Sequence, residues 1–288
     1  MQGVIAAVPT ALDNDGQPAK APFLEHCNWA LANGCDGLNI LGSTGEANSL
    51  DRAARMQVME WAAEALPKER LMVGTGTPSL AETIALTAHA DDLGYRVALV
   101  LPPYYYTPAS DDGLYEWYRA LHDALGERAI EIYFYNFPQM TGIPLPVSVI
   151  TRLNRDMPTR FTGIKDSSAD LPYCRELISA IPGFGVFPSS ETALGEAAAS
   201  GFAGCISATV NVSAVLCGQI WAAREDVPQD MLVKAAALRN AVAAHPLIPA
   251  VKEMVARRTG DMEWRRVMPP FMELSEEARA ELSVLEVD

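Results

Sequence analysis

The chain has 288 residues, a net charge of −14 at pH 7 and a sequence pI near 4.7, and 49% of its residues are hydrophobic. This length and composition allow a large core, in one big domain or two small ones. The acidic charge argues against binding to nucleic acid or to an anionic membrane surface.

The five cysteines are scattered and form no CxxC pair, which is untypical of a disulfide framework or a zinc site and fits a reducing cytoplasm. No basic region precedes the first apolar stretch, and no apolar run reaches the length that spans a bilayer. We therefore expect a cytoplasmic protein.

Apolar runs of strand length recur along the chain, with amphipathic segments of helical length between them. At 51–65 and 79–92, for example, apolar residues stand three and four positions apart, which predicts helices. Runs that are apolar throughout indicate strands buried on both faces, as in a parallel sheet. The eight runs lie at 3–10, 37–41, 71–75, 96–101, 130–135, 161–164, 184–187 and 203–206.

This alternation predicts an α/β protein with a (β/α)8 TIM barrel, whose strands and helices occupy residues 1–210. Residues 211–288 exceed what the last barrel helix needs, and prolines at His245-Pro246, Pro249 and Pro269-Pro270 divide them. We expect the last barrel helix and a C-terminal helical extension within the same structural unit. A doubly wound sheet is the alternative fold, but no GxGxxG follows the first strand and no P-loop is present.

In a barrel of this kind, catalytic groups lie at the C-terminal ends of the strands and in the loops after them. Polar clusters occur there in GSTGE (42–46), PPYYYTP (102–108), YNFP (135–138), IKDSS (164–168) and PSSE (188–191). The GSTGE turn combines hydroxyl and amide donors that suit a carboxylate. Taken alone, however, it fits a helix-capping turn better. The four histidines are too dispersed for a metal site.

Lys165 ends an apolar strand, where lysine is rarely buried without a partner. Desolvation favours the neutral amine, which is the form that attacks a ketone. The alternative is a structural ion pair with Asp166 or another carboxylate. Tyr135 ends the preceding apolar run and by itself fits a core tyrosine with one hydrogen bond. A reactive neighbour such as Lys165 would make it a proton shuttle.

With GSTGE, PYY, YNFP and GIKDS in this order at strand ends, the chain resembles the dihydrodipicolinate synthase and N-acetylneuraminate lyase family of pyruvate-dependent class I aldolases. The resemblance covers nearly the whole chain. It implies that Lys165 forms a Schiff base with pyruvate or a 2-keto acid, and that Tyr135 relays protons. It also implies that Ser43 and Thr44 hold the pyruvyl carboxylate and link it to a proton relay, with Thr44 as a catalytic residue. Because the imine is the electron sink, no cofactor or metal is expected.

The resemblance further implies a homo-oligomer. Tyr105 matches a tyrosine that enters the active site of the neighbouring subunit in many members of the family. A dimer would then be the smallest active unit, and a dimer of dimers is the expected assembly.

Departures from the family pattern bear on the substrate. Dihydrodipicolinate synthases have an arginine five residues after the proton-relaying tyrosine, where this chain has Met140, so a second carboxylate clamp is lost. Sialic acid lyases place a glycine and an Asp-Glu pair after strand seven and a serine after strand eight, where this chain has PSSE and Ala208. The motifs YNFPxxTG and IKDSS look most like those of aldolases for 2-keto-3-deoxy sugar acids. This similarity implies reversible cleavage of such an acid to pyruvate and an aldehyde.

Further substrate contacts are expected from Gly45, Met140, Ser167, Ser190, Glu191 and Ile206. A 2-keto-3-deoxy sugar acid dehydratase, an N-acetylneuraminate lyase or a dihydrodipicolinate synthase would use the same lysine imine, and the sequence separates aldolase from dehydratase poorly. Outside enzymes, the alternative is a protein that only binds pyruvate or another keto acid on the same barrel.

Overall fold

The computed structural model describes residues 1–285, and it contains the eight strands expected from the sequence. The strands are parallel, and their order is β7-β6-β5-β4-β3-β2-β1-β8. A backbone hydrogen bond of 2.9 Å from Ala203 to Val186 brings the two end strands together. The bounds are β1 Gly3–Ala7, β2 Gly37–Ile40, β3 Leu71–Gly74, β4 Val97–Val100, β5 Glu131–Asn136, β6 Phe161–Asp166, β7 Gly185–Pro188 and β8 Gly204–Ser207.

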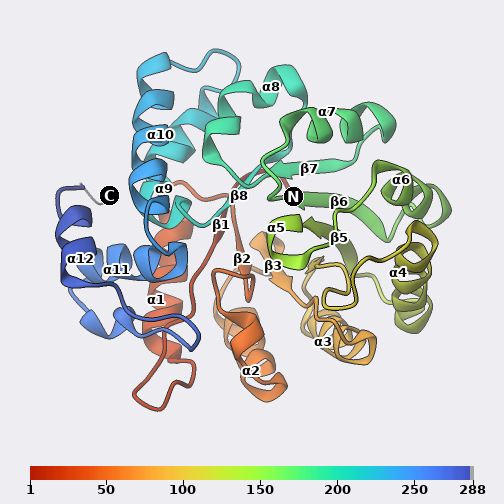
Figure 1. The fold of residues 1–288 in the computed structure, drawn as a ribbon, viewed down its shortest axis with the longest axis horizontal. Coiled ribbons are helices and arrows are strands. Elements are labelled where there is room, and N and C mark those ends of the chain that lie inside the picture. The colour runs from red at the N-terminus through yellow and green to blue at the C-terminus, as the bar shows by residue number, and fades with distance from the viewer. Residues whose placement is uncertain (286–288) are drawn as a thin grey trace.

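The predicted TIM barrel is confirmed, because every strand starts at its expected position or one residue later. Helices form the outer layer around the strands (Figure 1). They are α1 Lys20–Ala32, α2 Arg52–Ala65, α3 Leu80–Leu93, α4 Asp111–Leu125, α6 Val147–Asp156, α7 Leu171–Ala180, α8 Ala197–Ser200 and α9 Val210–Ala222, and the short α5 Pro138–Thr141 lies in the loop after β5.

The two helices expected from periodicity correspond to α2 and α3, and each begins at a side-chain cap. The Asp51 carboxylate accepts from the Ala54 N–H at 2.8 Å, and the Ser79 hydroxyl accepts from the Glu82 N–H at 3.3 Å. Such caps satisfy backbone donors that have no partner within the helix. The sequence therefore fixes where these helices start.

The expected C-terminal extension is helical, with α10 Gln229–Ala243, α11 Leu247–Thr259 and α12 Glu276–Leu282. In Figure 1 these helices lie together on one side of the barrel, where α10 and α11 pack against α9. The sequence predicted that Pro249 divides a helix, and this prediction is wrong. Pro249 lies in the first turn of α11, where backbone N–H groups have no intrahelical acceptor. The last residues of the expected extension, 286–288, lie outside the described residues.

The barrel interior is filled by side chains that alternate along the strands. A Cβ atom at position 163 of β6 would lie 2.8 Å from the Tyr133 ring. Glycine at this position therefore leaves room for the ring. The apolar side chains packed inside are Ile5, Ala7, Met72, Val97, Leu99, Tyr133, Tyr135, Phe187 and Ile206. A filled barrel leaves ligands to bind at its mouth.

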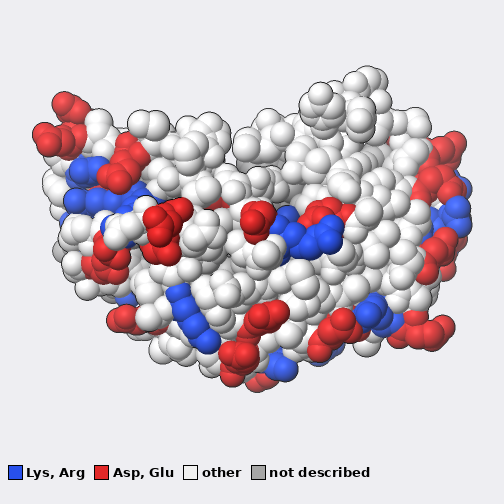
Figure 2. Space-filling view, turned by 90° about the horizontal axis from the view of Figure 1, so that it is seen from below, with Lys and Arg blue, Asp and Glu red and all other residues white. Residues whose placement is uncertain are grey.

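Charged side chains of both signs lie side by side on the face shown in Figure 2. Opposite charges interspersed in this way are typical of a solvated surface. Among residues 1–285, no helix combines the length and the hydropathy needed to cross a membrane.

Candidate active site

Lys165 and Tyr135 are direct neighbours at the C-terminal ends of β6 and β5, where they are paired in register. The Lys165 Nζ donates a hydrogen bond to the Tyr135 phenol oxygen at 3.2 Å and lies 4.4 Å from the centroid of that ring. Only 4% of Lys165 and 3% of Tyr135 are exposed. The amine and the phenol that the sequence places on successive strands are therefore in contact and buried together.

The alternative of a structural ion pair does not hold for Lys165. No carboxylate within residues 1–285 lies within the 4.0 Å of its Nζ that defines a salt bridge. Asp166, the next residue of β6, accepts hydrogen bonds from the Asn136 amide at 2.7 Å and the Ser168 hydroxyl at 2.8 Å. The phenol of Tyr135 is thus the polar partner of Lys165 in the described part of the chain.

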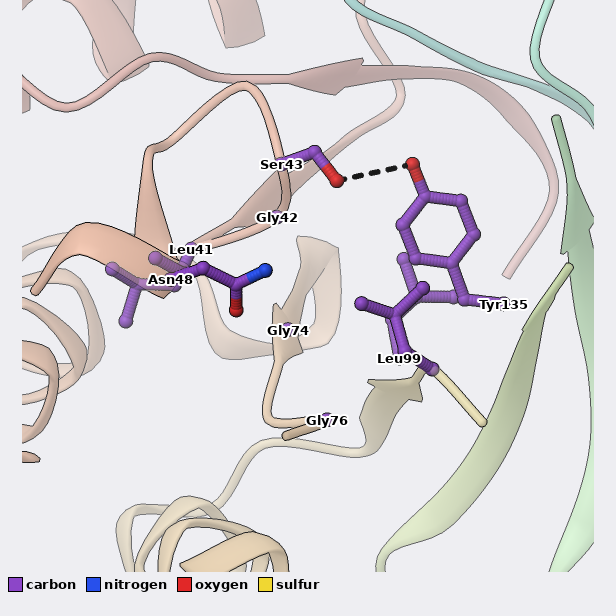
Figure 3. A pocket seen from close by; sticks show the side chains of 10 residues that line it. Leu41, Gly42, Ser43, Asn48, Gly74, Gly76, Leu99 and Tyr135 are labelled. Carbon is purple, nitrogen blue, oxygen red and sulfur yellow. Dashed lines mark hydrogen bonds between the residues drawn. The ribbon is translucent and has the colours of Figure 1, made fainter. Parts of the chain in front are cut away.

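The environment of Tyr135 favours release of its proton. Burial raises the pKa of this phenol, but the positive charge of Lys165 and hydrogen bonds with Ser43, Ser167 and Lys165 together outweigh burial, so the pKa lies below its ordinary value. Figure 3 shows the Ser43 side chain pointing at the phenol, and the two oxygens are 3.4 Å apart. Phe137 stacks on the ring, with a centroid distance of 5.8 Å.

The GSTGE segment forms a tight turn between β2 and η1 Ala47–Ser49. Hydrogen bonds from the Gly45 N–H to the Gly42 carbonyl (3.0 Å) and from the Glu46 N–H to the Ser43 carbonyl (3.1 Å) close it. Ser43 and Thr44 do not cap the following helix, because Asp51 caps α2. Their backbone N–H groups donate to no acceptor in residues 1–285, so two amides remain for a ligand beside the Thr44 hydroxyl and the Ser43 hydroxyl that contacts Tyr135.

A buried ion pair holds this turn from behind. Lys252 of α11 donates to the Glu46 carboxylate, and neither side chain is exposed. The second Glu46 oxygen accepts from the Met268 N–H at 2.6 Å, and Lys252 also donates to the Arg266 carbonyl at 2.6 Å. Burial lowers the pKa of Lys252, and the Glu46 carboxylate opposes part of this shift. The helical extension is thereby fastened to the turn after β2.

A cavity with a volume of about 340 Å³ opens above Lys165 and Tyr135, which is enough for a small ligand. A second cavity of about 280 Å³ adjoins it and reaches Tyr104. Within residues 1–285, no group of three or more His, Cys, Asp or Glu side chains is arranged to hold a metal ion. The other residues that line the first cavity are Ser43, Thr44, Phe137, Met140, Ser167, Ser189, Ile206, Ala208, Arg239, Leu247, Ile248 and Phe271.

Most residues expected at the site line this cavity, namely Lys165, Tyr135, Ser43, Thr44, Met140, Ser167 and Ile206. Three do not. Gly45 accepts a hydrogen bond from Thr10 through its carbonyl at 2.8 Å. The Ser190 hydroxyl pairs with that of Thr192 at 2.7 Å, and the Glu191 carboxylate is fully buried behind the cavity wall. Tyr105 does not reach the cavity within its own chain, and 81% of it is exposed.

Sequence reasoning missed Arg239, which reaches the cavity from α10. It is bound to the Glu191 carboxylate at 3.0 Å. Site residues of a barrel are expected at strand ends, whereas Arg239 belongs to a helix beyond the last strand. One local signal exists, because Arg239 is a lone charge within the apolar segment AAALRNAVAA (235–244). A single charge in such a segment commonly has a buried partner or a ligand.

A lysine in contact with a tyrosine at the mouth of a TIM barrel, beside a donor-rich turn, is the arrangement of a lyase of the class I aldolase type. The model of the Dihydrodipicolinate synthetase family matches residues 1–286, and the chain belongs to this family. The resemblance predicted from the four motifs is thereby confirmed, and the protein is an enzyme of this class.

Individual relatives agree with this assignment. The chain is 34% identical over 208 residues to an uncharacterized DapA-like lyase of Chloroflexus aurantiacus, which covers 72% of this chain and 69% of the relative. Dihydrodipicolinate synthase from Agrobacterium tumefaciens superposes with a TM-score of 0.88 at 28% identity, covering 98% of this chain and 97% of that one. YagE, a prophage protein of the same family from E. coli K12 solved in complex with pyruvate, has a TM-score of 0.86 at 26% identity, with 98% and 96% covered.

Proposed function

We propose that this enzyme reversibly cleaves a 2-keto-3-deoxy sugar acid to pyruvate and an aldehyde through a Schiff base on Lys165. The observation that carries the proposal is the 3.2 Å contact between the buried Lys165 amine and the Tyr135 phenol, in a cavity bounded by Ser43 and Thr44. Membership of the family supports the lysine chemistry, and the pyruvate bound to YagE supports the keto-acid half of the substrate.

The reaction begins at the amine. The neutral Nζ of Lys165 attacks the C2 ketone. The oxygen leaves as water with one proton from the amine and one from Tyr135, which gives a protonated imine and the Tyr135 phenolate. Tyr135 then takes the proton of the C4 hydroxyl. The C3–C4 bond breaks, its electrons flow into the imine, and the aldehyde departs. Protonation of the enamine at C3 and hydrolysis of the imine release pyruvate and restore Lys165.

The GSTGE turn orients the keto acid for this sequence. The backbone N–H groups and the hydroxyls of Ser43 and Thr44 would donate to the pyruvyl carboxylate. Because Ser43 also lies 3.4 Å from the phenol oxygen of Tyr135, binding of the carboxylate there brings the ketone to the Lys165–Tyr135 pair. With the keto acid held there, attack of the Lys165 amine on the ketone becomes effectively unimolecular.

The cavity wall favours a sugar acid over aspartate semialdehyde. Met140 lines the cavity and offers no donor to the carboxylate of the semialdehyde. Ser167 and Ser189 line the same wall, and a serine hydroxyl can both donate to and accept from the hydroxyl groups of a polyol. Glu191 and Ser190 do not line the cavity and do not serve as direct contacts in this proposal.

We also propose that the active unit is a dimer, with a dimer of dimers as the full assembly. Tyr105 and Tyr106 are 81% and 79% exposed on the segment between β4 and α4, and two aromatic rings so exposed favour a buried position in an interface. In this assembly Tyr105 enters the site of the partner subunit.

A substrate panel tests the proposed reaction. It contains 2-keto-3-deoxy hexonates and pentonates, N-acetylneuraminate, and pyruvate with aspartate semialdehyde, each scored by release or consumption of pyruvate. We expect pyruvate release to be fastest with a 2-keto-3-deoxy sugar acid. Efficient condensation with the semialdehyde would contradict the proposal. Loss of the sugar acid without release of pyruvate would instead identify a dehydratase.

A further inference from the structure

We propose that Arg239 binds an anionic group, a carboxylate or a phosphate, at the far end of the sugar acid. This inference rests on the proposed function and names the class of substrate more closely. Arg239 and Lys165 are the two cationic residues that line the 340 Å³ cavity, and no Asp or Glu lines it. In a chain with a net charge of −14, such a cavity is a local site for anions.

One edge of the Arg239 guanidinium is occupied and the other is open. The Nη1 atom donates to Glu191 at 3.0 Å, Thr209 at 3.1 Å, Ser207 at 3.2 Å and the Ser189 carbonyl at 3.3 Å. In residues 1–285, Nε and Nη2 have no acceptor, and 26% of the side chain is exposed. The Nε–Nη2 edge is the fork that binds a carboxylate or phosphate through two parallel hydrogen bonds.

The Glu191 carboxylate fixes the direction of this fork. It is fully buried, and it accepts hydrogen bonds from the hydroxyls of Ser207 (2.7 Å) and Thr209 as well as from Arg239. Two donors at the end of β8 and one on α10 leave the carboxylate little freedom. A preorganised guanidinium loses less entropy on binding than a free arginine side chain. Glu191 offsets part of the positive charge, but it does so from behind the cavity wall.

The position of Arg239 agrees with the path of a sugar acid. Lys165 lies on β6, Ser189 follows β7, and Ser207 ends β8, which places Arg239 over the ends of β7 and β8. A chain that starts at the Schiff base would pass Ser167 and Ser189 before it meets the guanidinium. The substrate class is therefore a 2-keto-3-deoxy sugar diacid, or a phosphate ester of a 2-keto-3-deoxy sugar acid.

The test compares three substrates with the same carbon chain, which end in a primary alcohol, a carboxylate or a phosphate ester. We expect the unchanged enzyme to have its highest kcat/KM with one of the anionic substrates. Comparison of the carboxylate with the phosphate ester identifies which anionic group Arg239 binds. Arg239→Met should lower kcat/KM for that substrate on the order of 10- to 100-fold, the range expected for hydrogen bonds to a charged group. Arg239→Lys should retain part of the preference, since it keeps the charge but loses the fork.

Lys234→Met is the matched control, because it removes a positive charge from the exposed side of the same helix α10. It should leave the ratio of kcat/KM between anionic and neutral substrates unchanged. If Arg239 only held the fold together, Arg239→Met would lower kcat/KM for all three substrates by the same factor, and the inference would be wrong. It would also be wrong if the unchanged enzyme did not distinguish the three.

Failure of the Arg239 assignment can be distinguished from failure of the proposed Schiff-base reaction. Failure of pyruvate to form a borohydride-reducible adduct on Lys165 would overturn the Schiff-base proposal itself. A normal adduct together with no preference for an anionic substrate would overturn only the assignment of Arg239.

Discussion

The buried ion pair between Glu46 and Lys252 predicts that Lys252→Met destabilises the fold strongly. The substitution removes the cation and leaves the Glu46 carboxylate buried, with the Met268 N–H as its remaining partner in the described residues. Removing one partner of a buried pair costs about 3–5 kcal/mol, because the other charge remains without compensation. That is a large fraction of the roughly 5–15 kcal/mol by which a folded protein is stable.

Urea unfolding measures this effect. The double variant Glu46→Gln with Lys252→Met is the matched control, since a neutral amide can still accept from Met268 and no charge is left buried. We expect it to recover most of the stability lost in Lys252→Met. The reasoning is refuted if Lys252→Met costs less than about 1 kcal/mol, or if the double variant is no more stable than the single one.

Further predictions concern the proton relay, pH and the second carboxylate clamp. Tyr135→Phe should lower kcat by about 10²- to 10⁴-fold while borohydride still traps pyruvate slowly on Lys165; near-normal turnover would remove the relay role. Burial, reinforced by the charge of Arg258, lowers the pKa of His26 to about 4 against an opposing hydrogen bond from His26 Nε2 to the Asn211 side-chain oxygen. The unfolded chain then binds more protons, so stability should fall by up to about 3 kcal/mol as pH drops from about 6.5 to 4. His26→Gln should flatten this slope in urea unfolding at several pH values. Met140→Arg should increase condensation of pyruvate with aspartate semialdehyde, and no gain would show that position 140 does not face that carboxylate.

The barrel could be predicted because its signal is local. Strands buried on both faces are apolar at most positions, so eight runs mark them directly. Lys165 and Tyr135 could be predicted for a related reason: polar residues that end such runs meet at one edge of a parallel sheet. The order of the strands makes β5 and β6 neighbours, and their register pairs Tyr135 with Lys165.

The contacts that sequence reasoning missed join distant parts of the chain. Lys252 and Glu46 are 206 residues apart, and Arg239 and Glu191 are 48 apart, so no local pattern links them. Glu191 was expected in the cavity because it follows β7. Its carboxylate turns instead to the hydroxyls of Ser207 and Thr209, which compensate a buried charge. Which groups a buried carboxylate binds therefore depends on the donors that the folded chain places around it.

The central claim is that Lys165 forms a Schiff base with pyruvate, and borohydride trapping tests it most directly. The enzyme is incubated with pyruvate and borohydride, and peptide mapping by mass spectrometry locates the reduced adduct. We predict one adduct, on Lys165, and none in Lys165→Ala, with circular dichroism showing that this variant is folded. No adduct in the unchanged enzyme, or an adduct on another lysine, would contradict the account.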